Sequence, residues 1–93
     1  MPLKTMPFNP FDYMDNQEEM NVFLIECFQD PDPQVFVSAL GHLVKKHGVA
    51  DVAKATGVSR ESLYKSFNGT TQPRWDTIHR VMTALKVDVT QAA

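Results

Sequence analysis

Basic and hydrogen-bonding side chains gather in one short segment, residues 49–69, which reads VADVAKATGVSRESLYKSFNG. Arg60 carries a guanidinium group that can donate two hydrogen bonds to O6 and N7 of a guanine. Tyr64 and Lys65 share the predicted outward face, where they could contact bases or hold a phosphate. The chemistry available to this segment is therefore recognition of duplex DNA, with Arg60 as the candidate for direct base contact.

Other polar residues flank Arg60 on the same predicted surface. Ser59 is expected to cap the helix, which leaves neighbouring backbone amides directed at a phosphate. Glu61 would be repelled by the DNA backbone unless it accepts a hydrogen bond from cytosine N4. We expect further phosphate contacts just beyond the helix, from Thr70, Thr71, Gln72 and Arg74. For every one of these residues except Arg60, exposure to solvent without any DNA contact is the alternative.

A helix-turn-helix would position these side chains, and the segment meets its geometric demands in order. One inward residue of the first helix must be small so that the second helix can cross closely, and Ala53 stands there. Gly57, four positions later, supplies the positive φ that the turn needs. The apolar anchors of the buried side are Val52, Val58, Leu63 and Phe67. A helical hairpin without any DNA role shows the same spacing, but the basic balance of the region argues against it.

Further helices are predicted around this motif. Asp15, with Glu18 three residues later, indicates an approximate N-terminal capping box for a helix of about fifteen residues. Asp32 and Pro33 mark the start of a second helix, which runs to His47. Apolar stripes at helical spacing give each helix an inner face, namely Met20, Phe23, Leu24, Cys27 and Phe28 in the first and Trp75, Ile78, Val81, Met82 and Leu85 in the last.

The predicted fold is all-α, with about five helices. Residues 1–14 are expected to be extended, because Pro7 and Pro10 forbid a regular helix there. The alternating tail, residues 87–90, allows a short C-terminal edge strand. We divide the chain into an N-terminal arm with an acidic amphipathic helix, residues 1–32, and a compact helix-turn-helix unit, residues 33–93.

The net charge of −2 hides a strong asymmetry. Residues 1–40 carry one lysine and seven carboxylates, a net −6, whereas residues 41–86 carry eight Lys or Arg and three carboxylates, a net +5. Such a split indicates two surfaces with different partners, the basic one suited to phosphate. Chance clustering of charges on exposed helix faces is the alternative.

The acidic half also carries aromatic residues whose apolar surface must be buried. Burial in the core is the default for them, and an interface with a partner protein or a second subunit is the alternative, because interfaces are enriched in aromatic side chains. The residues that we assign tentatively to such an interface are Phe8, Phe11, Tyr13, Asp15, Glu18 and Glu19.

Several classes of function are not supported by the residues present. His42 and His47 are five positions apart and face different directions, so no metal site is predicted. No nucleophile–base grouping or phosphate-binding glycine loop is visible, so neither catalysis, a cofactor nor a small-molecule substrate is expected. No apolar run is long enough for a bilayer or a signal peptide. Cys27, the single cysteine, fits a reducing compartment, and we expect a cytoplasmic protein.

Residues 41–86 resemble the phage-repressor/Cro (Xre) helix-turn-helix superfamily, and GVSRESLY is the most specific stretch. Nearly the whole chain resembles the HigA-like antitoxins, the small antidote proteins of addiction modules. The shared stretches are LKTMPFNPFDYMDNQEE, DPQVFVSALGHLVKKHGVADVAKATGVSRESLYKSF and TIHRVMTALKV. The resemblance implies a phage-repressor-like domain, and a dimer that binds operator DNA, represses its own operon and neutralises a RelE-like ribonuclease toxin.

Two positions depart from the pattern that the resemblance implies. Val49 stands where many members of the superfamily have a glutamine that binds phosphate, which puts that contact in doubt. Lys86 stands where such antitoxins usually have glycine. Two other functions therefore stay open: a solitary repressor without a toxin, and a protein-interaction module whose motif no longer binds DNA.

Overall fold

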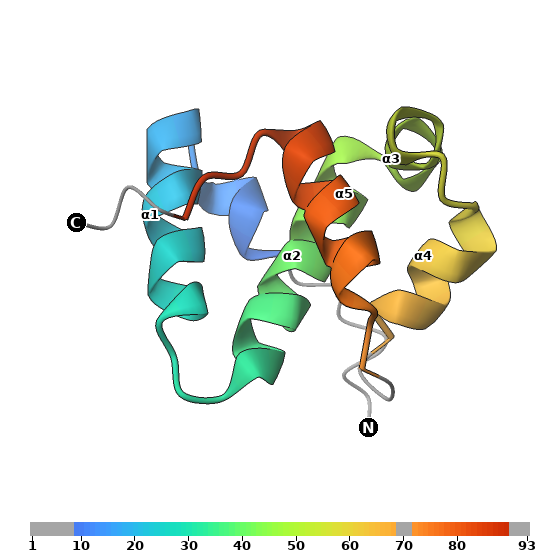
Figure 1. Ribbon diagram of the computed structural model, residues 1–93. Helices are drawn as coiled ribbons and strands as arrows, with labels where there is room; N and C mark the ends of the chain where they lie inside the picture. Colours follow the sequence, from blue (N-terminus) through green and yellow to red (C-terminus); the bar gives the residue numbers. More distant parts are fainter. Residues whose placement is uncertain (1–8, 69–71, 90–93) are drawn as a thin grey trace, which may run out of the picture.

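The computed structural model describes residues 9–68 and 72–89, and within these ranges it is all-helical, as predicted. One 3-10 helix and five α-helices follow one another, namely η2 (Pro10–Tyr13), α1 (Gln17–Phe28), α2 (Pro33–His47), α3 (Val49–Thr56), α4 (Arg60–Ser66) and α5 (Trp75–Leu85). Figure 1 shows α1 and α4 at opposite ends of the molecule, with α2 and α5 between them.

Local sequence signals set most of the helix ends. The Asp32 side chain accepts a hydrogen bond from the Gln34 N–H, and Pro33 occupies the first helical position of α2, where the missing donor costs nothing. The helix ends at Gly48, whose φ of 111° lies in the region that favours glycine. The predicted bounds of this helix are thus confirmed.

The start of α1 lies one residue later than predicted. Asn16, not Asp15, is the N-cap, and its side chain accepts from the Glu19 N–H at 2.8 Å. The Glu19 carboxylate reaches back and accepts from the Asp15 N–H at 2.9 Å, so Glu19 takes the place that we gave to Glu18. Asp and Asn are equally good caps, and the side chain that meets the free amides decides the register.

The arm is not fully extended, which corrects the prediction for residues 10–13. Pro10 starts one 3-10 turn that the Asn9 side chain caps by accepting from the Phe11 N–H. Asn9 Nδ2 also donates to the His42 carbonyl at 2.7 Å, and Lys46 Nζ lies 3.3 Å from Asp12 Oδ1. The turn is therefore fastened to α2 at both ends.

Phe11 lies in the core and not at the surface. Its side chain is fully buried, and its ring packs edge-on against Phe23 with centroids 5.5 Å apart. The buried Phe11 side chain is therefore not available for the interface contact that we assigned to it tentatively. Tyr13, two residues later, is exposed, and Phe8 lies outside the described residues.

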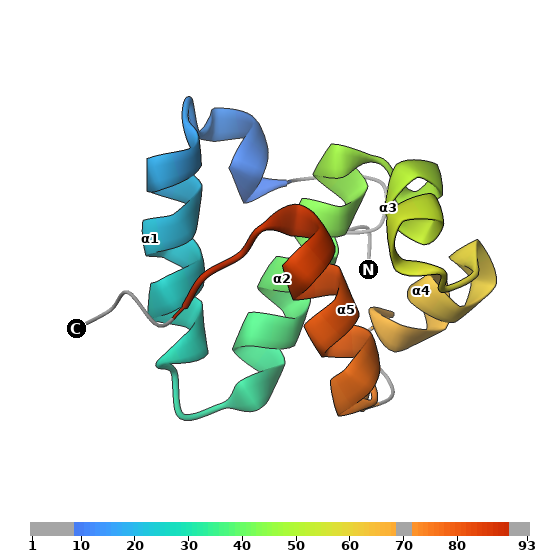
Figure 2. The same cartoon turned by 45° about the horizontal axis from the view of Figure 1, so that its top comes forward.

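One hydrophobic cluster joins both proposed parts of the chain. Phe11 and Leu24 from the N-terminal part meet Leu40, Val52 and Val81 from the rest, all at 0% exposure. Figure 2 shows the corresponding arrangement, with α1 and α2 side by side, and α5 packs mainly against α3. The two parts that meet at residue 32 share one hydrophobic core. The division there therefore stays a prediction that the two parts bind different partners.

The segment after α5 does not form the predicted edge strand. Lys86 adopts the left-handed conformation (φ 58°, ψ 41°), and the Val87 N–H donates to the Met82 carbonyl at 2.9 Å. Val87 is then buried against the helices, and residues 87–89 form no strand. The edge strand was wrong because, among the described residues, no strand is present that could pair with this segment.

Two aromatic residues are exposed, although helical spacing places them on the inner faces of their helices. Trp75 is 65% exposed and Phe28 is 48% exposed. Phe28 is the last residue of α1 and Trp75 the first residue of α5, and helical spacing alone does not determine whether a neighbouring helix covers a terminal residue. Among the described residues, no helix has the length and apolar composition to cross a bilayer.

Candidate nucleic-acid interface

The turn between α3 and α4 is built around Gly57. Its φ of 77° is left-handed, and its N–H donates to the Ala53 carbonyl at 2.9 Å. A Cβ added at Gly57 would meet nothing within 4 Å, so the backbone conformation and not the space requires glycine here. The predicted turn glycine is confirmed.

Thr56 closes the same turn and was not among the residues predicted for it. Its hydroxyl donates to the Val52 carbonyl at 2.7 Å and accepts from the Val58 N–H at 3.1 Å. One side chain thus joins the last turn of α3 to the residue that leads into α4. A threonine directly before a turn glycine is the signal that could have identified it, because Thr hydroxyls readily bond to nearby backbone groups.

The predicted anchors hold the two helices against the core. Val52 and Leu63 are buried, at 0% and 2% exposure. Ala53, Val58 and Phe67 are partly buried and pack against the same core. These positions fix the face of α4 that points outward.

The outward face of α4 carries the predicted DNA-contacting set. Ser59 caps the helix by accepting from the Ser62 N–H at 3.1 Å, and its hydroxyl also lies 3.0 Å from Ser62 Oγ. The side chains that follow are exposed, namely Arg60, Glu61, Tyr64 and Lys65. Because Leu63 and Phe67 hold the opposite side, this face is available to a large ligand.

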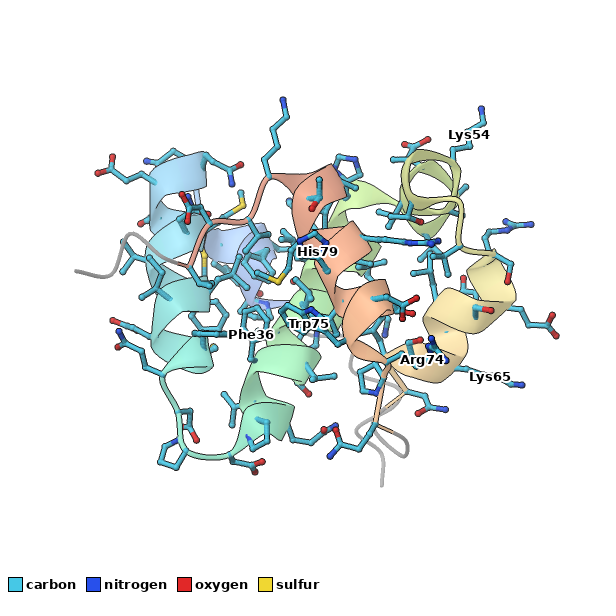
Figure 3. The ribbon with its side chains drawn as sticks, in the orientation of Figure 1. Phe36, Lys54, Lys65, Arg74, Trp75 and His79 are labelled. Carbon is cyan, nitrogen blue, oxygen red and sulfur yellow. The ribbon has the colours of Figure 1, made fainter. Side chains whose placement is uncertain are left out.

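Residues beyond α4 extend the polar surface toward α5. Gln72 and Arg74 are exposed and line a shallow groove with Ser62, Lys65 and Thr77. Figure 3 shows Lys65 and Arg74 on the same side of the molecule. Thr70 and Thr71, which we predicted here, lie outside the described residues.

Arg74 forms an ion pair on this surface. Its Nε lies 3.0 Å from Asp76 Oδ1, and this hydrogen bond with the attraction of the guanidinium lowers the pKa of the Asp76 carboxyl. The Arg74 side chain is still 83% exposed. Asp76 therefore directs the guanidinium and offsets part of its charge, which the sequence analysis did not anticipate.

A second groove approaches α4 from the other side. It lies between α2, α3 and α4 and is lined by Lys45, Val49, Tyr64 and Asn68, among others. Lys45 is exposed and adds a cation that we had not assigned to the site. Val49, in the position of the expected glutamine, is partly buried and packs against the core.

The carboxylates of the tentative partner set lie at the opposite end of the molecule. Asp15, Glu18 and Glu19 are exposed at the start of α1, far from α4 in both ribbon views (Figures 1 and 2). The chain thus presents a basic end at the helix-turn-helix and an acidic end at α1. Among the described residues, no three His, Cys, Asp or Glu residues are grouped so that they could hold a metal ion.

Comparisons with known proteins give a family and one relative. The model of a family described as "Probable addiction module antidote protein" matches residues 4–93. An uncharacterized protein of Haemophilus influenzae is 32% identical over 80 residues, which cover 86% of this chain and 82% of that protein. No solved structure matches the chain.

Proposed function

The chain belongs to this family of addiction module antidote proteins, and we propose that it is the antitoxin of a type II toxin–antitoxin module that also represses its own operon. In this proposal a homodimer in the cytoplasm binds operator DNA through α4 of each subunit. The cognate toxin is a RelE-like ribonuclease encoded beside it. Family membership carries the antitoxin role, and the exposed face of α4 supports the DNA-binding role.

The geometry of α4 is what favours DNA over another ligand at this end. A recognition helix contacts base edges with residues of its N-terminal turn, and Arg60 and Glu61 occupy that turn. Lys65, Gln72 and Arg74 then follow along one side, suited to the phosphates that flank a major groove. A dimer of such helices reads two half-sites about one helical turn apart, or a multiple of that distance.

The acidic end suits the toxin and not the DNA. A ribonuclease must attract the RNA backbone and is therefore expected to be basic. Asp15, Glu18 and Glu19 are exposed on α1 and would attract such a protein while repelling DNA. One chain can thus engage both partners on different surfaces.

Growth of a bacterial host tests the antitoxin role. The small reading frame adjacent to this gene is induced alone and together with this chain. We expect growth arrest that this chain relieves. No arrest, or arrest that it does not relieve, would contradict the antitoxin role and leave a solitary repressor.

Titration of labelled upstream duplex tests the DNA-binding role separately. Affinity should fall steeply with salt, since each neutralised phosphate contributes about −0.9 to the slope of log K against log salt. An unrelated duplex of equal length is the control. Equal, weak binding to both duplexes would indicate a protein-interaction module whose motif no longer recognises DNA.

A further inference from the structure

An apolar groove lies between the α1–α2 turn and the start of α5, and Gln72, one of the proposed phosphate contacts, stands where it adjoins the groove beside α4. The volume of the apolar groove is about 360 Å³, and its apolar lining includes Phe28, Pro31, Phe36, Trp75 and Ile78. Figure 3 shows Phe36 and Trp75 close together in this region. Neither the proposed DNA contacts nor the predicted toxin contacts at the start of α1 use these side chains.

Two large aromatic side chains that line the groove are largely exposed. Trp75 is 65% exposed, and its ring lies near that of His79, at a centroid distance of 6.0 Å. Phe28 is 48% exposed and packs edge-on against Phe36 at 5.1 Å. An exposed tryptophan beside an apolar depression is typical of the anchor region of a protein interface.

The rim of the groove identifies the charge of its partner. Asp30 is the charged residue of its lining. Glu26 and Asp32 are exposed carboxylates within four residues of Asp30 along the chain, and Asp32 lines a different groove. Residues 9–40 contain seven carboxylates and no Lys, Arg or His. This rim repels DNA. It also opposes a twofold contact in which the groove of one copy meets the same groove of a second copy, since that would face acid with acid.

We propose that this groove is the anchor site for the toxin, and that it takes a cationic toxin segment with an apolar or aromatic side chain. The apolar side chain would enter between Phe28 and Trp75, and Lys or Arg residues beside it would face Asp30. The proposal rests on the proposed antitoxin function and locates its principal contact. In this proposal, the carboxylates at the start of α1 attract the toxin over a long range, while the groove supplies most of the affinity for the toxin.

The test uses the purified full-length chain and the purified cognate toxin, in isothermal titration calorimetry. Trp75→Ala and Phe28→Ala remove the aromatic surface, and each should weaken toxin binding by at least about thirty-fold, as loss of an interface anchor does. Asp30→Asn keeps the oxygen that accepts from the Asp32 N–H but removes the charge. It should weaken binding several-fold and reduce its salt dependence.

Tyr64→Ala is the matched control, because Tyr64 is an aromatic residue of similar exposure (57%) on α4. Its toxin affinity should equal that of the unmodified chain. Circular dichroism and thermal unfolding of each variant establish that it is folded. A second readout, sedimentation of each variant alone, reports whether the groove holds the dimer together.

The outcomes separate this inference from the proposed function. If the unmodified chain does not bind the toxin, the antitoxin function itself fails. If it binds and the folded Trp75→Ala and Phe28→Ala variants bind equally well, the toxin contacts another surface and the inference is overturned. If these variants become monomers in sedimentation, a second copy occupies the groove, which also overturns the inference.

Discussion

Gly41 of α2 and Phe67 at the end of α4 approach so closely that a Cβ added to Gly41 would lie 3.1 Å from the Phe67 Cβ. The two residues are far apart in the sequence, and their contact brings the end of α4 against the central helix α2. The clashing atom belongs to the root of the Phe67 side chain, so a rotamer change does not relieve it.

Gly41→Ala should therefore lower the free energy of unfolding by about 1 kcal/mol, although alanine favours a helix interior. The gain in helix propensity is about 1 kcal/mol, and crowding of a packed site costs about 1–3 kcal/mol. Urea unfolding measures the difference. Ser38→Ala, at an exposed position of the same helix, is the control and should not destabilise; an equal gain in both variants would show that α4 yields freely at Phe67.

Thr56→Val should cost about 1–2 kcal/mol of stability, because the partly buried Val58 N–H loses its acceptor while the side-chain shape is kept. Thr56→Ser retains the hydroxyl and should cost less. Thermal unfolding of the two variants makes the comparison. If serine and valine destabilise equally, the hydrogen bonds across the turn contribute nothing, and only packing of the threonine methyl group matters.

Lys86→Gly should stabilise the chain by about 1 kcal/mol, because Lys86 is the non-glycine residue with positive φ among the described residues. For a domain of this size that gain raises Tm by about 4–8 °C. Lys86→Ala removes the same side chain but keeps the backbone strain, so its Tm should stay near that of the unmodified chain. A rise in Tm with alanine as large as with glycine would assign the effect to the lysine charge.

His42 should make the fold less stable as the pH falls. Burial, with a smaller contribution from Lys45, lowers the pKa of the His42 imidazole below its usual 6.5. The unfolded chain therefore binds more protons between that lowered pKa and about 6.5, so stability is lost as the pH falls through this window.

Urea midpoints measured from pH 7.5 to 5.5 test this expectation. His42→Gln should flatten the dependence, whereas His47→Gln, at an exposed position near the end of the same helix, should retain it. An unchanged slope in His42→Gln would place the responsible group elsewhere.

The features that the sequence predicted correctly are mainly local. Asp32, Gly57 and Ser59 act within three or four residues along the chain, so residue type and position suffice to predict them. At the start of α1, two capping residues stand side by side, and local preference does not choose between Asp15 and Asn16.

Several of the features that were not predicted depend on distant parts of the chain. Helical spacing places Trp75 and Phe28 on an apolar stripe, but whether another helix covers them depends on how far that helix extends. Phe11 is buried because Asn9 and Asp12 fasten its turn to α2, a contact that no local pattern announces. The pairing of Arg74 with Asp76 is local instead, since the two residues are two positions apart, and it altered one predicted site residue without removing it.

Arg60→Ala should abolish the preference for one base pair of the operator, at a cost of about 1–3 kcal/mol at that position. Lys65→Ala should weaken binding to all duplexes more uniformly, since an ammonium group that contacts phosphate carries no base information. Fluorescence anisotropy with a panel of single-base operator variants distinguishes the two patterns. Arg80→Ala removes an equal charge from an exposed position of α5 and should keep the full base preference. Retention of every base preference in Arg60→Ala would show that the guanidinium holds phosphate, and that another residue of α4 reads the sequence.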